Sequence, residues 1–219
     1  MTLGLGDRAW LRSGSTVLCL GAHADDIEIG CGGTLVRLLE EHPDVSVHWV
    51  VLSAPGARRD EALKSANVFL TGAASAEVSV QGHEERYFPY DGGALKRSFD
   101  ELGASISPDL VFTHRREDLH QDHRLVSELT WNTFRHQLIL EYEIPKWDGD
   151  LGQPNLFVPL AEDVCERKVS TILREFGSQR ERDWFTADTF WATLRLRGVE
   201  CHAPSGFAEA FHARKLILP

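Results

Sequence analysis

Two short clusters of histidine and aspartate are the residues of this chain best suited to chemistry. Residues 23–26, His-Ala-Asp-Asp, directly follow the apolar run 16–21, and residues 120–123, His-Gln-Asp-His, shortly follow a second apolar run at 110–113. An imidazole and a carboxylate three residues later can face the same point where a strand turns into a helix, and a later histidine can complete the set. Three such ligands are typical of catalytic zinc, because they leave one coordination position open for water. The pattern therefore predicts one divided metal site.

The elements that must position these clusters alternate along the first two thirds of the chain. Apolar runs predict strands, and amphipathic stretches that end near proline or glycine predict helices. Repeated strand-helix units imply an α/β fold, a Rossmann-like and mostly parallel sheet with helices on both faces. We expect strands at 16–21, 45–53, 78–80 and 110–113. We expect one helix that opens at Gly32-Gly33 and ends near 42–43, and further helices at 59–70, 94–106 and 122–136.

The last third is more loop-rich. Its pattern predicts strands at 138–144 and 155–160, helices at 162–176 and 189–197, and a terminal edge strand at 215–218. A loop rich in proline, glycine and aspartate, at about 145–155, suits either a substrate-facing rim or lid or an ordinary surface connection. We expect a single domain over residues 1–219.

Composition and charge exclude several classes of protein. The 219 residues are 42% hydrophobic, enough for one well-buried core, and the net charge of −10 argues against a nucleic-acid-binding or anionic-membrane surface. No apolar stretch approaches the roughly 20 residues that span a bilayer. The four cysteines have no Cys-x-x-Cys spacing, and no leader pattern opens the chain, so we expect free thiols in the cytoplasm.

The topology strengthens the metal-site hypothesis. Open α/β sheets bind ligands beyond the carboxyl ends of their strands, where the strand order reverses, and both clusters follow such ends. Either cluster alone has an ordinary explanation, since aspartates after a strand often cap a helix and complement its dipole. The coincidence of both clusters at equivalent ends favours a site.

These motifs resemble a known family. Residues 21–34, GAHADDIEIGCGGT, resemble the A-H-P-D-D-x-E-x-G-x-G-G opening of the zinc-dependent de-N-acetylases called PIG-L or LmbE-like, and residues 118–123, DLHQDH, resemble its D-x-H-x-D-H motif. Weaker similarity lies at 58–66, an R-x-x-E…A helix, and at 206–211, a closing A-E-A-F element. The resemblance implies a hydrolase that removes an N-acyl group from an amino-sugar or a related natural-product intermediate.

The resemblance also implies roles for individual residues. His23, Asp26 and His123 would bind the metal, Asp25 would be the general base, His120 would stabilise or protonate the tetrahedral intermediate, and Asp122 would orient His120 or a neighbour. Metal-bound water has its pKa lowered toward ~7, so a carboxylate beside it can take a proton near neutrality. Ala24 stands where the family usually has proline, and we expect a less rigid turn but no loss of metal.

Other candidates for binding substrate are less specific. Arg58 or Arg59 can hold hydroxyls, a phosphate or a carboxylate, although arginines that open a helix are usually solvated. His114 ends a predicted strand near the site, where it can touch substrate or be a packed polar residue. Glu28 is equally consistent with a supporting role in the site and with a first-turn helix acid. Trp147 is the tryptophan best placed to stack on a sugar ring.

Two functions of other classes compete with the deacetylase. The glycines at 30, 32 and 33 give a passing likeness to a dinucleotide fingerprint, but the acids at 25, 26 and 28 stand where a pyrophosphate needs backbone N–H groups. A metal-binding partner module without activity is the second alternative, and the presence of both Asp25 and His120 argues against it. We therefore expect a zinc enzyme with a small N-acylated substrate, and the oligomeric state stays open.

Overall fold

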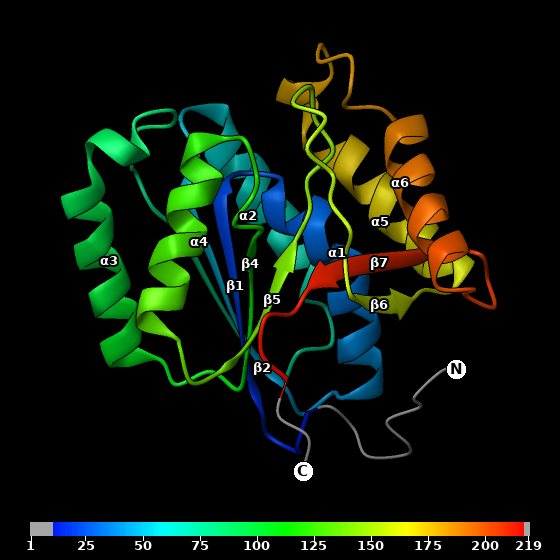
Figure 1. The fold of residues 1–219 in the computed structure, drawn as a ribbon, viewed down its shortest axis with the longest axis horizontal. Helices are drawn as coiled ribbons and strands as arrows, with labels where there is room; N and C mark the ends of the chain where they lie inside the picture. The colour runs from blue at the N-terminus through cyan, green and yellow to red at the C-terminus, as the bar shows by residue number, and fades with distance from the viewer. Residues whose placement is uncertain (1–10, 217–219) are drawn as a thin grey trace.

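One seven-stranded sheet organises the protein. The structure, a computed structural model, describes residues 11–216. The strand order is β3-β2-β1-β4-β5-β7-β6, and helices cover both faces (Figure 1). This arrangement confirms the predicted α/β class and the mostly parallel sheet.

The first five strands are parallel and are linked by helices. β1 lies near the centre, and its even-numbered apolar side chains, such as Leu18 and Leu20, pack in one core with α3 and α4, while Val17 and Cys19 pack in the other with α1 and α2. The elements are β1 (Thr16–His23), α1 (Asp26–Glu41), β2 (Ser46–Ser53), α2 (Ala57–Phe69), β3 (Ser75–Val80), η1 (Phe88–Tyr90), α3 (Gly92–Ser105), β4 (Leu110–His114), α4 (Gln121–Thr133) and β5 (Leu138–Tyr142).

The C-terminal part adds two antiparallel pairings. β7 (Ala208–His212) lies between β5 and β6 (Leu156–Pro159) and runs antiparallel to both. The remaining elements are α5 (Glu162–Glu175), η2 (Gly177–Gln179) and α6 (Ala187–Glu200), which lie on the same face of the sheet as α1 (Figure 1).

The predicted terminal strand at 215–218 is wrong where it can be checked. Lys215 and Leu216 are not in a strand, and residues 217 and 218 lie outside the described residues. Among residues 11–216, the last strand is β7. Its sequence, Ala-Glu-Ala-Phe-His, is short and contains an acid, whereas strand patterns favour the apolar run that follows it. A tertiary contact of Glu209 explains the acid.

Helix α1 begins earlier than the sequence indicated. Its first residue is Asp26, so the glycines at 32 and 33 lie inside the helix rather than at its start. A Cβ at Gly32 would come within 2.7 Å of the Phe69 ring, and one at Gly33 within 2.5 Å of a Leu160 methyl group. These glycines therefore allow α1 to pack closely on its neighbours, at the cost of helix propensity.

A buried ion pair forms hydrogen bonds with backbone groups of α1. Lys168 Nζ donates to the carbonyl of Ile29 (2.6 Å) and pairs with Glu209 Oε1 (2.5 Å). The Glu209 carboxylate in turn accepts from the backbone N–H groups of Gly33 (2.8 Å) and Thr34 (2.6 Å). The closing A-E-A-F element thus fastens β7 to the middle of α1, the helix whose first residue is Asp26.

All four cysteines are free, and three of them are buried. Within residues 11–216, no helix is both long enough and apolar enough to cross a membrane.

Candidate active site

The sheet topology brings the two sequence clusters together. β1 and β4 are parallel neighbours, and the chain leaves them toward opposite sides of the sheet, which is where ligands bind in open α/β folds. Residues 23–26 follow β1 and open α1, while residues 115–120 follow β4 and lead into α4. Segments about a hundred residues apart in sequence therefore meet at one edge.

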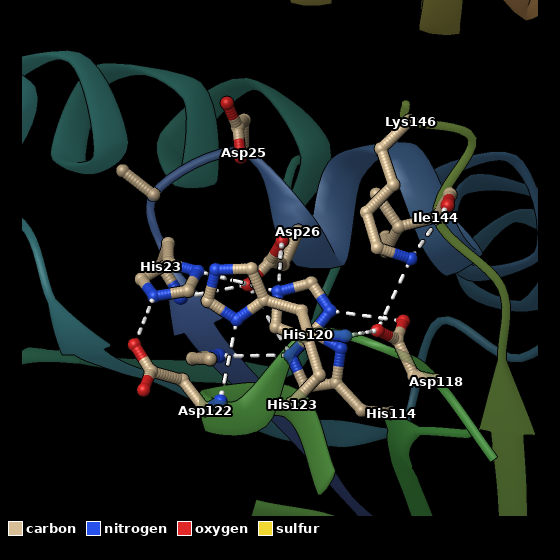
Figure 2. A network of polar contacts seen from close by, with 12 residues as sticks. His23, Asp25, Asp26, His114, Asp118, His120, Asp122, His123, Ile144 and Lys146 are labelled. Carbon is tan, nitrogen blue, oxygen red and sulfur yellow. Dashed lines mark hydrogen bonds and ion pairs between the residues drawn. The ribbon is translucent and has the colours of Figure 1, made fainter. Parts of the chain in front are cut away.

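Three side chains converge at this edge. His23 Nδ1 lies 3.5 Å from Asp26 Oδ2, His123 Nε2 lies 3.5 Å from Asp26 Oδ1, and the two imidazole nitrogens are 3.3 Å apart (Figure 2). All three residues are at least 93% buried, with exposures of 7%, 2% and 3%. The structure thus brings together the three residues that the resemblance named as metal ligands.

Each of the two histidines is held from behind by a carboxylate. Asp122 Oδ2 lies 2.9 Å from His23 Nε2, and Asp118 Oδ2 lies 3.0 Å from His123 Nδ1. The opposite ring nitrogens are thereby aimed at Asp26, which is the usual support of a metal-binding histidine. The Asp122 carboxylate contacts the ring of His23 and not that of His120. Of the two possibilities expected for Asp122, it therefore orients a neighbour of His120 and not His120 itself.

The donors fit a divalent metal. Bonds of about 2.0–2.1 Å from two nitrogens and one oxygen in tetrahedral geometry imply donor separations of about 3.3–3.4 Å. Here the two nitrogens are 3.3 Å apart, and each lies 3.5 Å from a different oxygen of Asp26. Among the described residues, two overlapping groups of three side chains could hold a metal ion, His23-His120-His123 and Asp26-His114-His123. His23, Asp26 and His123 take members from both groups and are the set whose rings are oriented by carboxylates.

The carboxylates also control the charge of the two histidines. Burial would lower the pKa of His23, but hydrogen bonds to Asp122 and Asp26 outweigh burial and raise it to about 9. Burial and the charge of His114 lower the pKa of His123 to about 3, against the opposite effect of Asp26 and Asp118. His123 is therefore neutral, as a metal ligand must be, and His23 carries a proton that a cation would replace.

His114, expected either to touch substrate or to be a packed polar residue, lies in the interior of the cluster. It is completely buried, stacks on His123 with ring centroids 3.9 Å apart, and its Nε2 lies 3.2 Å from Asp26 Oδ2. The same nitrogen accepts from the backbone N–H of Ala22 (2.9 Å). This burial favours the packed polar residue of the two expectations, and a role of His114 in binding substrate stays a prediction.

Asp25 sits on a strained turn beside this cluster. Its φ of 91° is in the left-handed region, which is costly for a residue other than glycine and is characteristic of functional sites. Figure 2 shows its carboxylate apart from the imidazoles, with no hydrogen bond to them. Burial raises the pKa of Asp25 to about 7, although the charge of Arg58 lowers it. A carboxyl group with such a pKa can exchange a proton near neutrality.

His120 is the residue before α4 and lies at the edge of the cluster. Its Nδ1 accepts from the backbone N–H of Asp122 (3.3 Å), so the ring caps the helix. The ring centroid lies 5.0 Å from that of His23 and 4.5 Å from that of His123. Burial and the charge of His23 lower the pKa of His120, against the effect of the surrounding carboxylates. Its half-buried position leaves it accessible to a bound molecule.

Arg58 joins the site and Arg59 does not. Arg58 Nη2 lies 3.7 Å from Asp25 Oδ2 and donates to the carbonyl of Ala24 (2.8 Å), while its Nη1 pairs with Glu85 (2.7 Å). Arg59 is exposed and donates to the carbonyl of Val80 at the end of β3, so the structure gives no support to its predicted contact with substrate.

Glu28 belongs to the interior. It is completely buried, and neither carboxylate oxygen has a hydrogen-bond partner among the described residues. Burial raises its pKa to about 8, so the group is largely protonated at neutral pH. Glu28 is therefore not a solvated acid of the first helical turn.

Two residues of the site were missed by the sequence assignment. Asp118 was quoted only as the first residue of the second motif, although it orients His123 and also lies 3.1 Å from Lys146 Nζ. Lys146 further pairs with Asp150 (2.6 Å), which accepts from the backbone N–H of Leu119 (2.7 Å). No local pattern indicates that Lys146 belongs to the site, because Asp118, its partner there, comes from another loop (Figure 2).

Comparison with known proteins identifies the family. A family model described as GlcNAc-PI de-N-acetylase, PIG-L, matches residues 18–134, which are 117 of the 219 residues. An uncharacterized deacetylase of Escherichia coli K12, YaiS, is 25% identical over 166 residues, covering 71% of this chain and 88% of its own. These matches confirm the expected class of enzyme, a hydrolytic N-deacetylase.

Solved structures share the fold at low sequence identity. N,N'-diacetylchitobiose deacetylase from Pyrococcus horikoshii superposes with a TM-score of 0.65 at 19% identity, over 91% of this chain and 83% of its own. GalB, the 4-carboxy-2-hydroxymuconate hydratase of Pseudomonas putida, gives 0.74 at 18% identity, over 94% and 98%. Since one of these is a hydratase, the likeness in structure establishes the fold and not the reaction. The match to the family model covers both metal motifs, and the chain belongs to the PIG-L family of de-N-acetylases.

Proposed function

We propose that this protein is a zinc-dependent deacetylase that hydrolyses the N-acetyl group of an amino-sugar or a related small natural product, with His23, Asp26 and His123 as metal ligands. The observation that carries the proposal is the convergence of these donors at 3.3–3.5 Å, with carboxylates behind both imidazoles. A bound zinc ion would supply Lewis-acid polarisation of the amide and a more acidic water.

The residues around the metal position supply the proton transfers. Asp25 takes the proton of the attacking water, since its pKa of about 7 suits a base near neutrality. His120 lies against both ligand histidines on the accessible side, where it stabilises the oxyanion or protonates the departing nitrogen. Asp122 acts through His23, whose ring it orients. Arg58 holds the turn of Asp25 through the Ala24 carbonyl.

The expected partners are small molecules. The family description and the curated relative both concern deacetylation, and the chain's net charge of −10 disfavours nucleic acid. The free cysteines agree with the proposed cytoplasmic location.

The proposal is tested by release of acetate. The protein is stripped with a chelator and reloaded with one equivalent of zinc, then incubated with a panel of N-acetylated sugars and their glycosides. We expect acetate only from the reloaded protein, and none from a reloaded His123→Ala variant, which also fails to retain zinc by elemental analysis. Acetate release that is insensitive to the chelator would contradict the metal-dependent mechanism.

A further inference from the structure

Two loops rise beyond the edge of the sheet that carries the site. One joins β5 to β6 (residues 143–155) and the other joins α5 to α6 (residues 176–186), and both stand above the ends of the parallel strands in Figure 1. Trp147 in the first loop is 65% exposed, and its ring meets that of Trp184 in the second loop edge to face at 6.1 Å. The two loops therefore form one continuous aromatic rim.

A guanidinium group in this rim has no anionic partner. The Arg182 Cζ atom lies 5.7 Å from the centroid of the Trp147 ring, and the side chain is only partly exposed. Among residues 11–216, no carboxylate lies within 4.0 Å of its nitrogens, whereas Arg58 is paired with Glu85. The rim borders the site, because Lys146, the neighbour of Trp147, lies 3.1 Å from Asp118, which orients His123; the positive charge of Arg182 also lowers the pKa of Asp25.

Both rim residues are held by anchored segments. Glu61 accepts hydrogen bonds from the backbone N–H (2.9 Å) and the hydroxyl (2.6 Å) of Ser178, four residues before Arg182. Phe185, three residues after it, is 3% exposed. Next to Trp147, Lys146 is paired with Asp118 and Asp150. The rim is therefore arranged in advance of any ligand, which lowers the entropy cost of binding.

The chemistry of the pair indicates its ligand. A guanidinium stacked on an indole still directs its N–H groups outward in its own plane, where they match a carboxylate or a phosphate. An exposed indole face covers the apolar face of a ring. We propose that Arg182 and Trp147 form a subsite for an anionic substituent of the substrate, with Arg182 binding a carboxylate or phosphate group and Trp147 lying against the ring that carries it. The inference rests on the proposed deacetylase function and narrows its substrate to acidic N-acetyl amino-sugars.

The kinetic test compares compounds that differ in charge. Zinc-loaded enzyme is assayed with N-acetylglucosamine, its 6-phosphate, and N-acetylmuramic acid, which carries a carboxylate. We expect Arg182→Gln to raise KM for a charged compound at least about tenfold with little change in kcat, because a charge-assisted hydrogen bond is lost, and to leave the neutral sugar unaffected. Arg182→Lys should restore part of the loss. The more affected of the two acids identifies the group that is bound.

A matched control and a binding readout separate this inference from the deacetylase proposal. Arg180→Gln changes an exposed arginine of the same loop, whose side chain donates to the Leu173 carbonyl, and should alter neither KM. Calorimetric titration of glucosamine and glucosamine 6-phosphate into the zinc-loaded protein reports the subsite without any turnover. Equal effects of Arg182→Gln on neutral and charged compounds in both assays would overturn the subsite. Absence of acetate from every compound would overturn the deacetylase proposal. The titration of glucosamine and glucosamine 6-phosphate would then decide by itself whether the subsite exists.

Discussion

At the residue scale, the turn after β1 separates two neighbouring aspartates by backbone conformation. Asp26 enters the helix and directs its carboxylate at three histidines, whereas Asp25, with φ of 91°, directs its carboxylate elsewhere. Ala24 is tied to the end of β2, because its N–H donates to the carbonyl of Ser53 (3.2 Å). Proline, which the family usually has here, lacks this donor, so the chain fixes the turn by a hydrogen bond instead of a ring.

The two aspartates should respond differently to the same substitution. Asp25→Asn should keep zinc and lower kcat by roughly 10²–10⁴, because a general base is lost. Asp26→Asn should lower zinc affinity, because a neutral amide is a poor ligand and leaves the cation with less negative charge. Zinc content by elemental analysis and acetate release by single-turnover assay distinguish these outcomes. Full turnover by Asp25→Asn would show that another group accepts the proton.

Much of the site could be predicted because its donors lie in two short motifs at strand ends. His23, Asp26 and His123 are local in sequence within each motif, and the parallel sheet supplies their meeting point. The burial of His114 and the contact of Lys146 with Asp118 could not be predicted, because they depend on how separate loops and helices pack. Tertiary position decides whether a polar residue faces the substrate or the core.

At the element scale, α1 carries the site at its first turn and a polar junction at its middle. The strand and helix pattern was predictable from apolar runs, whereas β7 was not, because its acid and small residues lack a strand signal. The structure supplies the missing reason. Glu209 of β7 accepts hydrogen bonds from two backbone N–H groups of α1, and Lys168 of α5 donates one to the Ile29 carbonyl. Side chains that enter a helical ladder in this way fix its path.

Removal of one member of this buried pair should be costly. Lys168→Met leaves the Glu209 carboxylate buried without its cation, and we expect the free energy of unfolding to fall by about 3–5 kcal/mol. The control is Arg167→Met, one residue before Lys168 on α5. It breaks the exposed pair of Arg167 with Glu40 and should lower the free energy of unfolding by less than about 1 kcal/mol. Urea denaturation followed by circular dichroism measures both. Equal, small losses would mean that the junction contributes little to the fold.

At the scale of the whole molecule, one carboxylate joins the parallel part of the sheet to the C-terminal part. Glu143 follows β5 and pairs with Arg197 of α6 (2.6 Å), lies 3.3 Å from His212 of β7, and accepts from the N–H of Gly152 in the rim loop (2.7 Å). Burial would raise the pKa of Glu143, but these three partners outweigh burial and lower it below its ordinary value of 4.5.

This junction should make stability depend on pH in a defined direction. Since the folded protein lowers the pKa of Glu143, the carboxylate contributes stability that is fully present above about pH 4.5, its unfolded pKa, and is lost as pH falls through the lower folded pKa. Glu143→Gln should therefore cost about 3–5 kcal/mol at pH 7, and the difference from the unsubstituted protein should shrink as the medium becomes more acid than pH 4. Glu200→Gln, which removes the more exposed partner of Arg197, should cost less than about 1 kcal/mol at every pH. Denaturation midpoints measured from pH 7 to pH 3 check the prediction. A Glu143→Gln deficit that stays constant over this range would show that the lost packing, and not the buried charge, holds the two parts of the sheet together.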